Sequence, residues 1–172
     1  MKVYYLLLTI NLLIGEVLFT DITNDAGISF SGMSEGVCVF DYNNDGLDDI
    51  LFTTRGGSTI HLYKNNGGIN FTNVSIESNI GHQMEARTAI AGDYDNDGDQ
   101  DLIASGWNVI DNNLVTKVYQ NEPLGTYVEL PVDGLHAVAY GDIDAVDIDH
   151  DGDLDISISG VDSVSNFATR VH

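Results

Sequence analysis

The chain is poor in basic side chains, proline and cysteine, and each shortage excludes a class of protein. Only six of the 172 residues are lysine or arginine, against 27 aspartates and glutamates, which gives a formal charge of −21. Such a charge disfavours nucleic acids and anionic membranes as partners. The single cysteine, Cys38, excludes a disulfide framework, and its apolar neighbours predict a buried small hydrophobe. Two prolines and 43% hydrophobic residues are typical of a folded domain rather than a disordered chain.

Long apolar runs are also scarce, and the longest lies at the N-terminus. It extends from Val3 to Ile14, interrupted by two polar residues, and follows Lys2. Because it is too short to span a bilayer comfortably, we interpret residues 1–15 as a secretory signal peptide. The cleavage site stays open, since Leu13 is larger than the small residue usual two places before Gly15. A buried strand is the alternative interpretation, whereas a signal would make the protein extracellular or cell-surface.

The most informative stretch is Asp-Tyr-Asp-Asn-Asp-Gly-Asp-Gln-Asp at residues 93–101. Side-chain oxygens occupy its positions 1, 3, 5 and 9, and Gly98 at position 6 permits a sharp turn. Hard cations such as Ca²⁺ take about six to eight oxygen ligands, often including a backbone carbonyl, which we assign to position 7. The predicted ligands of this loop are Asp93, Asp95, Asp97, Asp99 through its carbonyl, and Asp101.

The same pattern occurs once upstream and once downstream, with first ligands 52 and 54 residues apart. One copy is equally compatible with a solvated acidic turn, but three copies at a near-constant period favour cation binding and a repeat architecture. Since Asn43 replaces an acid, the first loop is expected to bind most weakly, and about three Ca²⁺ ions per chain are expected. The further ligands are Asp41, Asn43, Asp45, Leu47 through its carbonyl, Asp49, Asp147, Asp149, Asp151, Asp153 through its carbonyl, and Asp155.

Short apolar runs flank each loop and predict strands. They are too short for helices, so each loop is expected in a β-hairpin, which disfavours EF-hand and dockerin-like modules because these need flanking helices. The runs before the loops are Val37–Phe40, Thr88–Ala91 and Ile143–Val146. The runs after the loops are Ile50–Thr53, Leu102–Ala104 and Ile156–Ser159.

Two further runs complete a unit of about 50 residues. Alternating apolar and polar residues predict a third strand at Thr59–Tyr63, Val115–Tyr119 and Ala168–His172. A fourth strand is expected at Phe71–Ser75 and Tyr127–Leu130, and also at Phe19–Thr23, which matches Phe71–Ser75 at an offset of 52. Four antiparallel strands repeated radially are the blades of a β-propeller, so the fold class is all-β.

The repeats resemble the FG-GAP/VCBS family, found in the propellers of integrin α-subunits and in many secreted bacterial proteins. The resemblance is carried by Phe19–Ile28, similar to a recurrent opening of these repeats, and by Ala91–Asp99, which is close to the consensus. It implies Ca²⁺ in the hairpin between the first two strands of each blade, on the loop ligands named above. After the signal, the propeller region is expected at 16–172, with a lone outer strand at 17–23, blades at 31–78 and 84–131, and a partial blade at 135–172.

Because propellers typically close with about 4–8 blades, we expect an incomplete propeller and further blades in the natural protein. Asp142 offers another start for the third loop, but that register would place Val146 at a ligand position and is rejected.

No motif for catalysis or for an organic cofactor is recognised: phosphate-loop, zinc and nucleophile-elbow patterns are absent. His82 and His136 each lie 11 residues before a first loop ligand; a metal or acid–base role is conceivable, but polar residues of blade-connecting loops are favoured. Asp142 and Asp144 could form a carboxylate pair, but in such an acidic chain we interpret them as solvated or channel-lining side chains. Trp107 is either an exposed anchor for a sugar or protein, or packs against its own hairpin, which we favour.

Three functions remain open. The first is a secreted, non-enzymatic, calcium-binding module for protein or carbohydrate binding or adhesion, which rests on the family resemblance because fold does not determine function. The second is the propeller part of an extracellular polysaccharide lyase or hydrolase. The third is a structural scaffold beside another domain.

Overall fold

The computed structural model shows an all-β chain of eleven strands among the residues it describes. These are residues 19–30, 32–56, 59–123, 125–164 and, for the backbone alone, 167–171. The strands are β1 (Met33–Phe40), β2 (Asp49–Arg55), β3 (His61–Asn65), β4 (Phe71–Asn73), β5 (Met84–Gly92), β6 (Asp101–Asn108), β7 (Asn113–Glu122), β8 (Thr126–Leu130), β9 (Ala139–Val146), β10 (Asp155–Val161) and β11 (Phe167–Val171).

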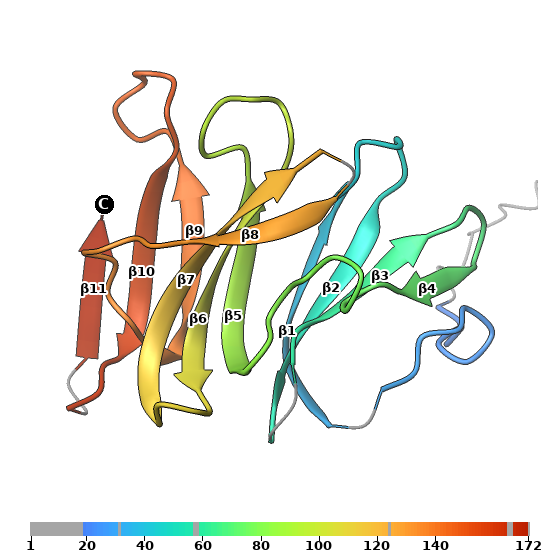
Figure 1. Cartoon of the computed structure of the whole chain (residues 1–172), viewed down its shortest axis with the longest axis horizontal. Coiled ribbons are helices and arrows are strands. Elements are labelled where there is room, and N and C mark those ends of the chain that lie inside the picture. The colour runs from blue at the N-terminus through green and yellow to red at the C-terminus, as the bar shows by residue number, and fades with distance from the viewer. Residues whose placement is uncertain (1–18, 31, 57–58, 124, 165–166, 172) are drawn as a thin grey trace, which may run out of the picture.

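The strands form three separate antiparallel sheets in chain order. The first sheet runs β1-β2-β3-β4 and the second β5-β6-β7-β8, while the third contains β9, β10 and β11 with β10 in the middle. We call them the first, second and third blade, because they stand side by side like the blades of a propeller that is not closed (Figure 1). The predicted fold class, an incomplete propeller of antiparallel blades, is confirmed.

The first strands of neighbouring blades pack beside one another: β1 and β2 contact β5, and β5 contacts β9. Alternation along the strands gives each sheet two faces, and the second blade uses both. Its Leu102 and Ala104 pack into a core shared with Leu51 and Leu62 of the first blade. Its Ile103, pointing the other way, joins a core with residues of the third blade: Val138, Ile143, Ile156 and Ile158.

Two glycines allow close strand contact where the pairing is irregular. β5 shifts register between Ala86 and Thr88, and a Cβ added to Gly106 on β6 would lie 2.1 Å from the carbonyl oxygen of Glu85. The pairing of β10 with β9 shifts in the same way, and a Cβ on Gly141 would lie 1.8 Å from the carbonyl oxygen of Ser159. Side chains at these two positions would therefore force the first hairpin of each blade apart.

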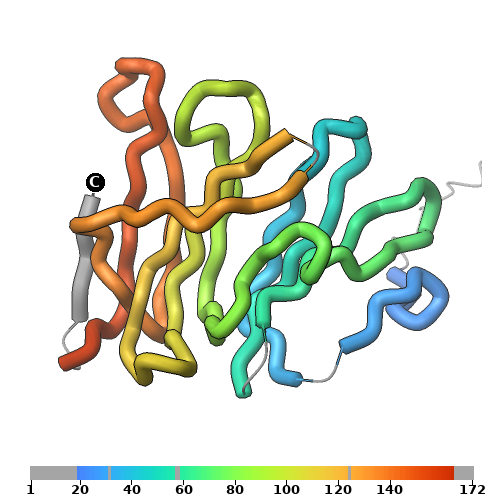
Figure 2. The backbone as a smooth tube through the Cα atoms, viewed as in Figure 1, coloured from blue at the N-terminus to red at the C-terminus, as the bar shows by residue number. Residues whose placement is uncertain are grey.

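The three acidic loops lie at one edge of the assembly. Each connects the first strand of a blade to the second, and all three stand at the upper end of the view in Figure 1. Figure 2 shows how the chain after β8 runs across to reach the third blade. Because β9 ends at Val146, the third loop starts at Asp147, whereas Asp142 lies within β9 opposite Ser159.

One predicted strand is wrong. Residues 19–22 lie in no strand, and residues 23–27 form a turn with a hydrogen bond from the Ala26 N–H to the Ile22 carbonyl. A fourth strand needs a third strand as its neighbour, and in the first two blades that place is taken by β4 and β8. The proposed signal peptide at 1–15 and the first two residues of the expected strand at 17–23 lie outside the described residues.

The other expected strands are present with different ends. The first strands begin four residues earlier than their apolar runs, at Met33, Met84 and Ala139, because polar residues on the exposed face continue the pairing. The third strand of the first blade is shifted to His61–Asn65, and β7 is extended to ten residues. No part of the described chain forms a helix long and apolar enough to cross a membrane.

We predict that Leu51→Ala destabilises the chain strongly, because Leu51 is fully buried between the first and second blades. Removing such a side chain costs about 2–5 kcal/mol of unfolding free energy. The control is Val39→Ala in the paired strand, where the side chain is 59% exposed and the expected change is within about 0.5 kcal/mol. Urea unfolding followed by circular dichroism measures both, and equal losses would contradict the shared core.

Candidate metal centres

The first aspartate of every acidic loop accepts two backbone hydrogen bonds from within the loop. The two oxygens of Asp41 accept from the N–H groups of Asp45 and Gly46, at 3.1 and 2.7 Å. The matching distances are 3.0 and 3.0 Å at Asp93, and 3.1 and 3.1 Å at Asp147. Each carboxylate thus holds the loop closed by satisfying N–H groups that have no strand partner.

Positions 3 and 5 repeat this arrangement. Asn43, Asp95 and Asp149 each accept the N–H of position 5, at 3.1, 3.2 and 3.2 Å. The carboxylates at position 5 accept the N–H of position 7, in the pairs Asp45–Leu47, Asp97–Asp99 and Asp151–Asp153, at 3.1, 3.1 and 3.0 Å. The three loops therefore share one internal geometry, as their common sequence pattern predicts.

Each loop contains two residues with positive φ. Gly46, Gly98 and Gly152 at position 6 have φ values of 84°, 97° and 100°, which glycine adopts at little cost. Position 4 is also left-handed, with φ of 56°, 60° and 63° at Asn44, Asn96 and His150. The sequence indicated the glycine but not position 4, although asparagine, found twice there, is the non-glycine residue that best tolerates this conformation.

The aspartate at position 9 connects the loop to the rest of its blade. Asp49 is fully buried and accepts the N–H of Tyr42 at 3.0 Å and that of Asn65, at the end of β3, at 2.6 Å. Asp101 is 3% exposed and accepts the N–H groups of Tyr94 and Asn121 at 3.2 and 2.7 Å. Burial raises the pKa of both carboxyls, partly offset by these hydrogen bonds.

In the third loop, Asp155 accepts the N–H of Ile148 at 2.9 Å, which matches the Tyr42 and Tyr94 contacts. The sequence predicts position 9 as a ligand at the start of the next strand. In the structure the same carboxylate also supports the loop, by accepting the N–H of position 2.

Two loops gather carboxylates closely enough for a shared ion. Oxygens of Asp93, Asp95 and Asp101 lie within 4.8 Å of one another, as do oxygens of Asp147, Asp149 and Asp151. Two other predicted side-chain ligands, Asp97 and Asp155, are not in these close groups. The donors are all oxygen, so the sets fit a hard cation such as Ca²⁺ rather than a thiolate- or imidazole-seeking metal.

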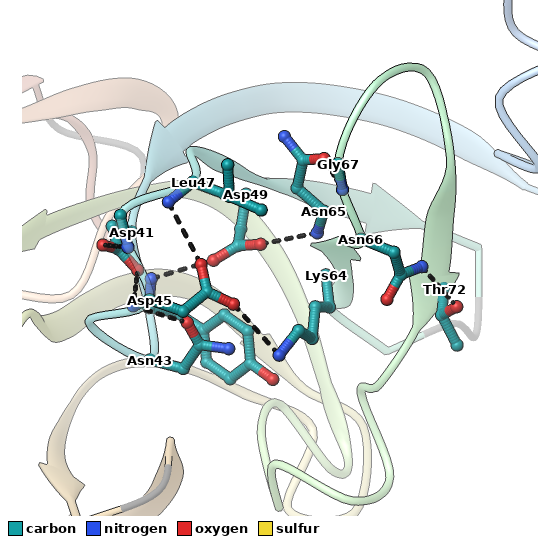
Figure 3. Close-up of polar contacts among 12 residues, drawn as sticks. Asp41, Asn43, Asp45, Leu47, Asp49, Lys64, Asn65, Asn66, Gly67 and Thr72 are labelled. Atoms are coloured by element: carbon teal, nitrogen blue, oxygen red, sulfur yellow. Dashed lines mark hydrogen bonds and ion pairs between the residues drawn. The ribbon is translucent and has the colours of Figure 1, made fainter.

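The first loop differs because it contains its own positive charge. The ammonium group of Lys64, on β3, lies 3.1 Å from a carboxylate oxygen of Asp45 (Figure 3). The hydrogen bond from Lys64 holds the pKa of Asp45 below its usual range. In the second blade the matching residue is Gln120, whose amide donates to Asp95 instead.

Lys64 was missed from the sequence as part of the site. The sequence does contain a signal for this residue. Lys64 directly precedes Asn65 and Gln120 directly precedes Asn121, and each asparagine donates its N–H to the position-9 aspartate of its own blade.

Side chains also connect neighbouring loops. The amide of Asn44 donates to the carbonyl of Gly98 at 3.4 Å, and the amide of Asn96 donates to Asp153 at 2.9 Å. The position-4 residue of each of the first two loops thus reaches the next loop along the chain. Asp99 lies at the same junction; burial and the neighbouring Asp97 carboxylate raise its pKa to about 6.

The remaining sequence candidates lie apart from these loops. His82 is exposed and His136 half-buried, while Asp142 and Asp144 are exposed on β9 and Asp142 accepts a hydrogen bond from Thr88 at 3.0 Å. Trp107 donates to Asn112 of its own hairpin at 3.2 Å, which confirms the favoured interpretation. Cys38 was expected to be buried but is half-buried at the side of the first core.

We predict that Asp49→Asn destabilises the chain even when calcium is chelated. An amide offers one acceptor oxygen where the carboxylate satisfies two backbone N–H groups, so one buried N–H loses its partner. The expected loss is about 1–3 kcal/mol of unfolding free energy. Asp48→Asn, at the exposed neighbouring position, is the control and should change little. Thermal melting in EDTA measures both; identical midpoints for the two variants would contradict this structural role.

Comparison with known families agrees with this geometry. The model of the FG-GAP-like repeat matches residues 41–104, from the first ligand position of the first loop into β6. The match therefore contains the first two acidic loops, while the third loop lies outside it. A search of curated proteins found no significant match. Residues 41–104 thus belong to the FG-GAP-like repeat family, set in a β-propeller-like arrangement of blades.

Proposed function

We propose that the chain is a secreted, calcium-stabilised β-propeller-like module that binds protein or carbohydrate and has no catalytic activity of its own. The observation that carries the calcium part is the repetition of one loop geometry three times, with oxygen donors only. In the second and third loops, oxygens of three carboxylates lie within 4.8 Å of one another, which suits a shared hard cation. Calcium modules of the extracellular space commonly bind at about 10⁻⁴–10⁻³ M, which fits a secreted protein.

In this proposal the loop side chains have two tasks. They accept the backbone N–H groups of the loop, and in the second and third loops their oxygens lie close enough together for a cation to supply the missing positive charge. In the second loop Asp93, Asp95 and Asp101 would hold the ion, and in the third loop Asp147, Asp149 and Asp151. Because the loops join the first two strands of each blade, a bound cation would stabilise the hairpin that packs nearest the next blade.

The first loop is proposed as the weakest site for two reasons. Asn43 contributes no charge, and the ammonium group of Lys64 already lies on Asp45. A cation entering this loop has to compete with Lys64 for the carboxylate, which lowers its apparent affinity. The ranking from the sequence therefore gains a second, independent argument.

We place the role of the module in binding or adhesion on the resemblance to FG-GAP/VCBS propellers. A cavity of about 160 Å³ beside the second blade supports a ligand with polar groups. Lys117, Glu129 and Tyr119 line it, and the Tyr119 hydroxyl is buried without a hydrogen-bond partner among the described residues. Sugar hydroxyls or peptide groups would satisfy such a hydroxyl.

Further blades of a longer protein are part of the proposal. Val37 and Val39 of β1 are 62% and 59% exposed on the face turned away from the second blade. A neighbouring blade would cover this apolar face, as the second blade covers the other.

We predict that calcium raises the melting temperature of the metal-free chain and that EDTA reverses the effect. Binding to the folded state alone stabilises it by about 2.7 kcal/mol per site at 100 times the dissociation constant. Calorimetric titration of Asp95→Asn should show a weakened second site, because this change removes a charge from the close group of the second loop and leaves an asparagine there, as in the first loop. Asp133→Asn, at an exposed position outside the loops, should match the parent. A midpoint that EDTA does not change would contradict structural calcium.

We predict that Lys64→Gln strengthens calcium binding in the first loop about two- to fivefold, since it removes a partly exposed competing ion pair. The reciprocal change Gln120→Lys should weaken the second loop, because it introduces an ammonium group beside Asp95. Titrations in an Asp95→Asn background isolate the first change from the second loop. Opposite shifts support competition by the lysine, while equal affinities in parent and variants would exclude it.

A further inference from the structure

A second kind of oxygen-lined site lies between the first two blades, beside the first and second hairpin loops. A cavity of about 170 Å³ separates the first acidic loop from the turn between β7 and β8. The first blade contributes Tyr42, Asn43 and Asn44, and the second blade contributes Asp99, Asn121 and Glu122. No residue lining it is basic, so the cavity is negatively charged.

Asn121 is the buried side chain aimed into this cavity. It is 3% exposed, and its amide nitrogen donates to two backbone carbonyls, those of Tyr42 at 2.7 Å and Gln100 at 3.1 Å. These two acceptors fix the orientation of the amide, because a flipped group would place oxygen against oxygen. The Oδ1 atom is therefore held on the opposite side, buried and without a hydrogen-bond partner among the described residues.

A second acceptor in the same cavity is also without a partner. The Oδ1 atom of Asp99 is buried and accepts no hydrogen bond within the described chain. The matching residue of the third loop, Asp153, is exposed and accepts from Asn96, so the situation of Asp99 is not a general property of the loop. Burying a carboxylate oxygen and an amide oxygen without donors costs free energy unless something positive or hydrogen-donating lies between them.

We propose that a divalent cation binds in this cavity between the first and second blades, on the Oδ1 atoms of Asp99 and Asn121, with Glu122 as an outer carboxylate. Oxygen acceptors and negative charge without basic residues match the preference of Ca²⁺. The volume leaves room for the ion and several waters, since one water occupies about 30 Å³. The ion would join two blades, whereas the hairpin sites each belong to one.

This site is distinct from the hairpin sites but adjoins them. It uses the side chain of Asp99, whereas the second hairpin loop would use the backbone carbonyl of that residue, and Asn43 of the first loop also lines the cavity. It would also explain why Asn121 is placed where it is. Asn121 links the first loop to the second blade through Tyr42, and its N–H supports Asp101, so one residue would couple blade packing, loop geometry and the cation.

The test is a calorimetric Ca²⁺ titration of the metal-free chain and three variants. Asp99→Asn removes the charge from the cavity but keeps the backbone, and should bind one ion fewer than the parent. Asp153→Asn is the matched control at the same loop position and should bind as many ions as the parent. Glu122→Gln, an exposed change outside the hairpin loops, should weaken one site about tenfold.

The stability of the same variants gives a second readout. In EDTA, Asp99→Asn should melt at or above the temperature of the parent, because it replaces a carboxylate that has an unpartnered buried oxygen by a neutral amide that can also donate. In Ca²⁺ the order of the melting temperatures should reverse, so that the parent melts above Asp99→Asn. A destabilised Asp99→Asn chain in EDTA would contradict the assignment of that oxygen as an empty acceptor.

Other outcomes separate this proposal from the hairpin sites. Equal stoichiometry for the parent, Asp99→Asn and Glu122→Gln, with unchanged affinities, would mean that the cavity holds water only and would overturn the proposal. If the parent binds a single ion that Asp99→Asn loses but Asp95→Asn keeps, the site between the blades stands and the hairpin sites fail. If Asp95→Asn weakens a site while Asp99→Asn neither removes nor weakens one, the hairpin sites stand and the site between the blades fails.

Discussion

The structure depends on the pairing of aspartate carboxylates with the backbone N–H groups of the hairpin loops. Residues in such a tight turn cannot pair their N–H groups with a neighbouring strand, and the oxygens at positions 1, 3 and 5 accept them instead. The solution has an electrostatic cost, because it concentrates like charges within 4.8 Å in two of the loops. The acidity of the chain and its need for positive charge at these loops are therefore two consequences of one local geometry.

The hydrogen bonds of the loops also connect the strands within a blade and the blades to one another. Asp49 and Asp101 fix the start of the second strand to the end of the third, so a disturbed loop would also disturb the sheet. Asn44 and Asn96 then connect each loop to the next, and Asn121 connects the second blade to the backbone of the first. The edge that carries the loops is thus a continuous polar layer above the apolar cores between blades.

Much of this arrangement is predictable from the sequence because it depends on short-range chemistry. The glycine at position 6, the alternating carboxylates and the apolar runs predict the hairpins, their order and the four-stranded unit. The features that sequence analysis fails to predict are those that depend on partners distant along the chain. The strand at Phe19–Thr23 needs a neighbour that its own sequence cannot provide, and the pairing of Lys64 with Asp45 appears only when β3 is placed beside the loop. The unpartnered oxygen of Asn121 likewise requires two blades to be in contact.

Three loops with one geometry need not respond to calcium in one way. The first has three carboxylates and an ammonium group on Asp45, so part of its repulsion is neutralised within the chain. The second has only the neutral amide of Gln120 at the matching place and a further carboxylate, Asp99, at the blade junction. Its unbalanced charge is therefore larger, and it adjoins both neighbouring blades. A cation would thus contribute more to stability in the second blade than in the first, whose hairpin would hold its shape at lower calcium. The two loops thus differ in their expected response to calcium through a residue of the third strand, outside the acidic motif. This residue is Lys64 in the first blade and Gln120 in the second.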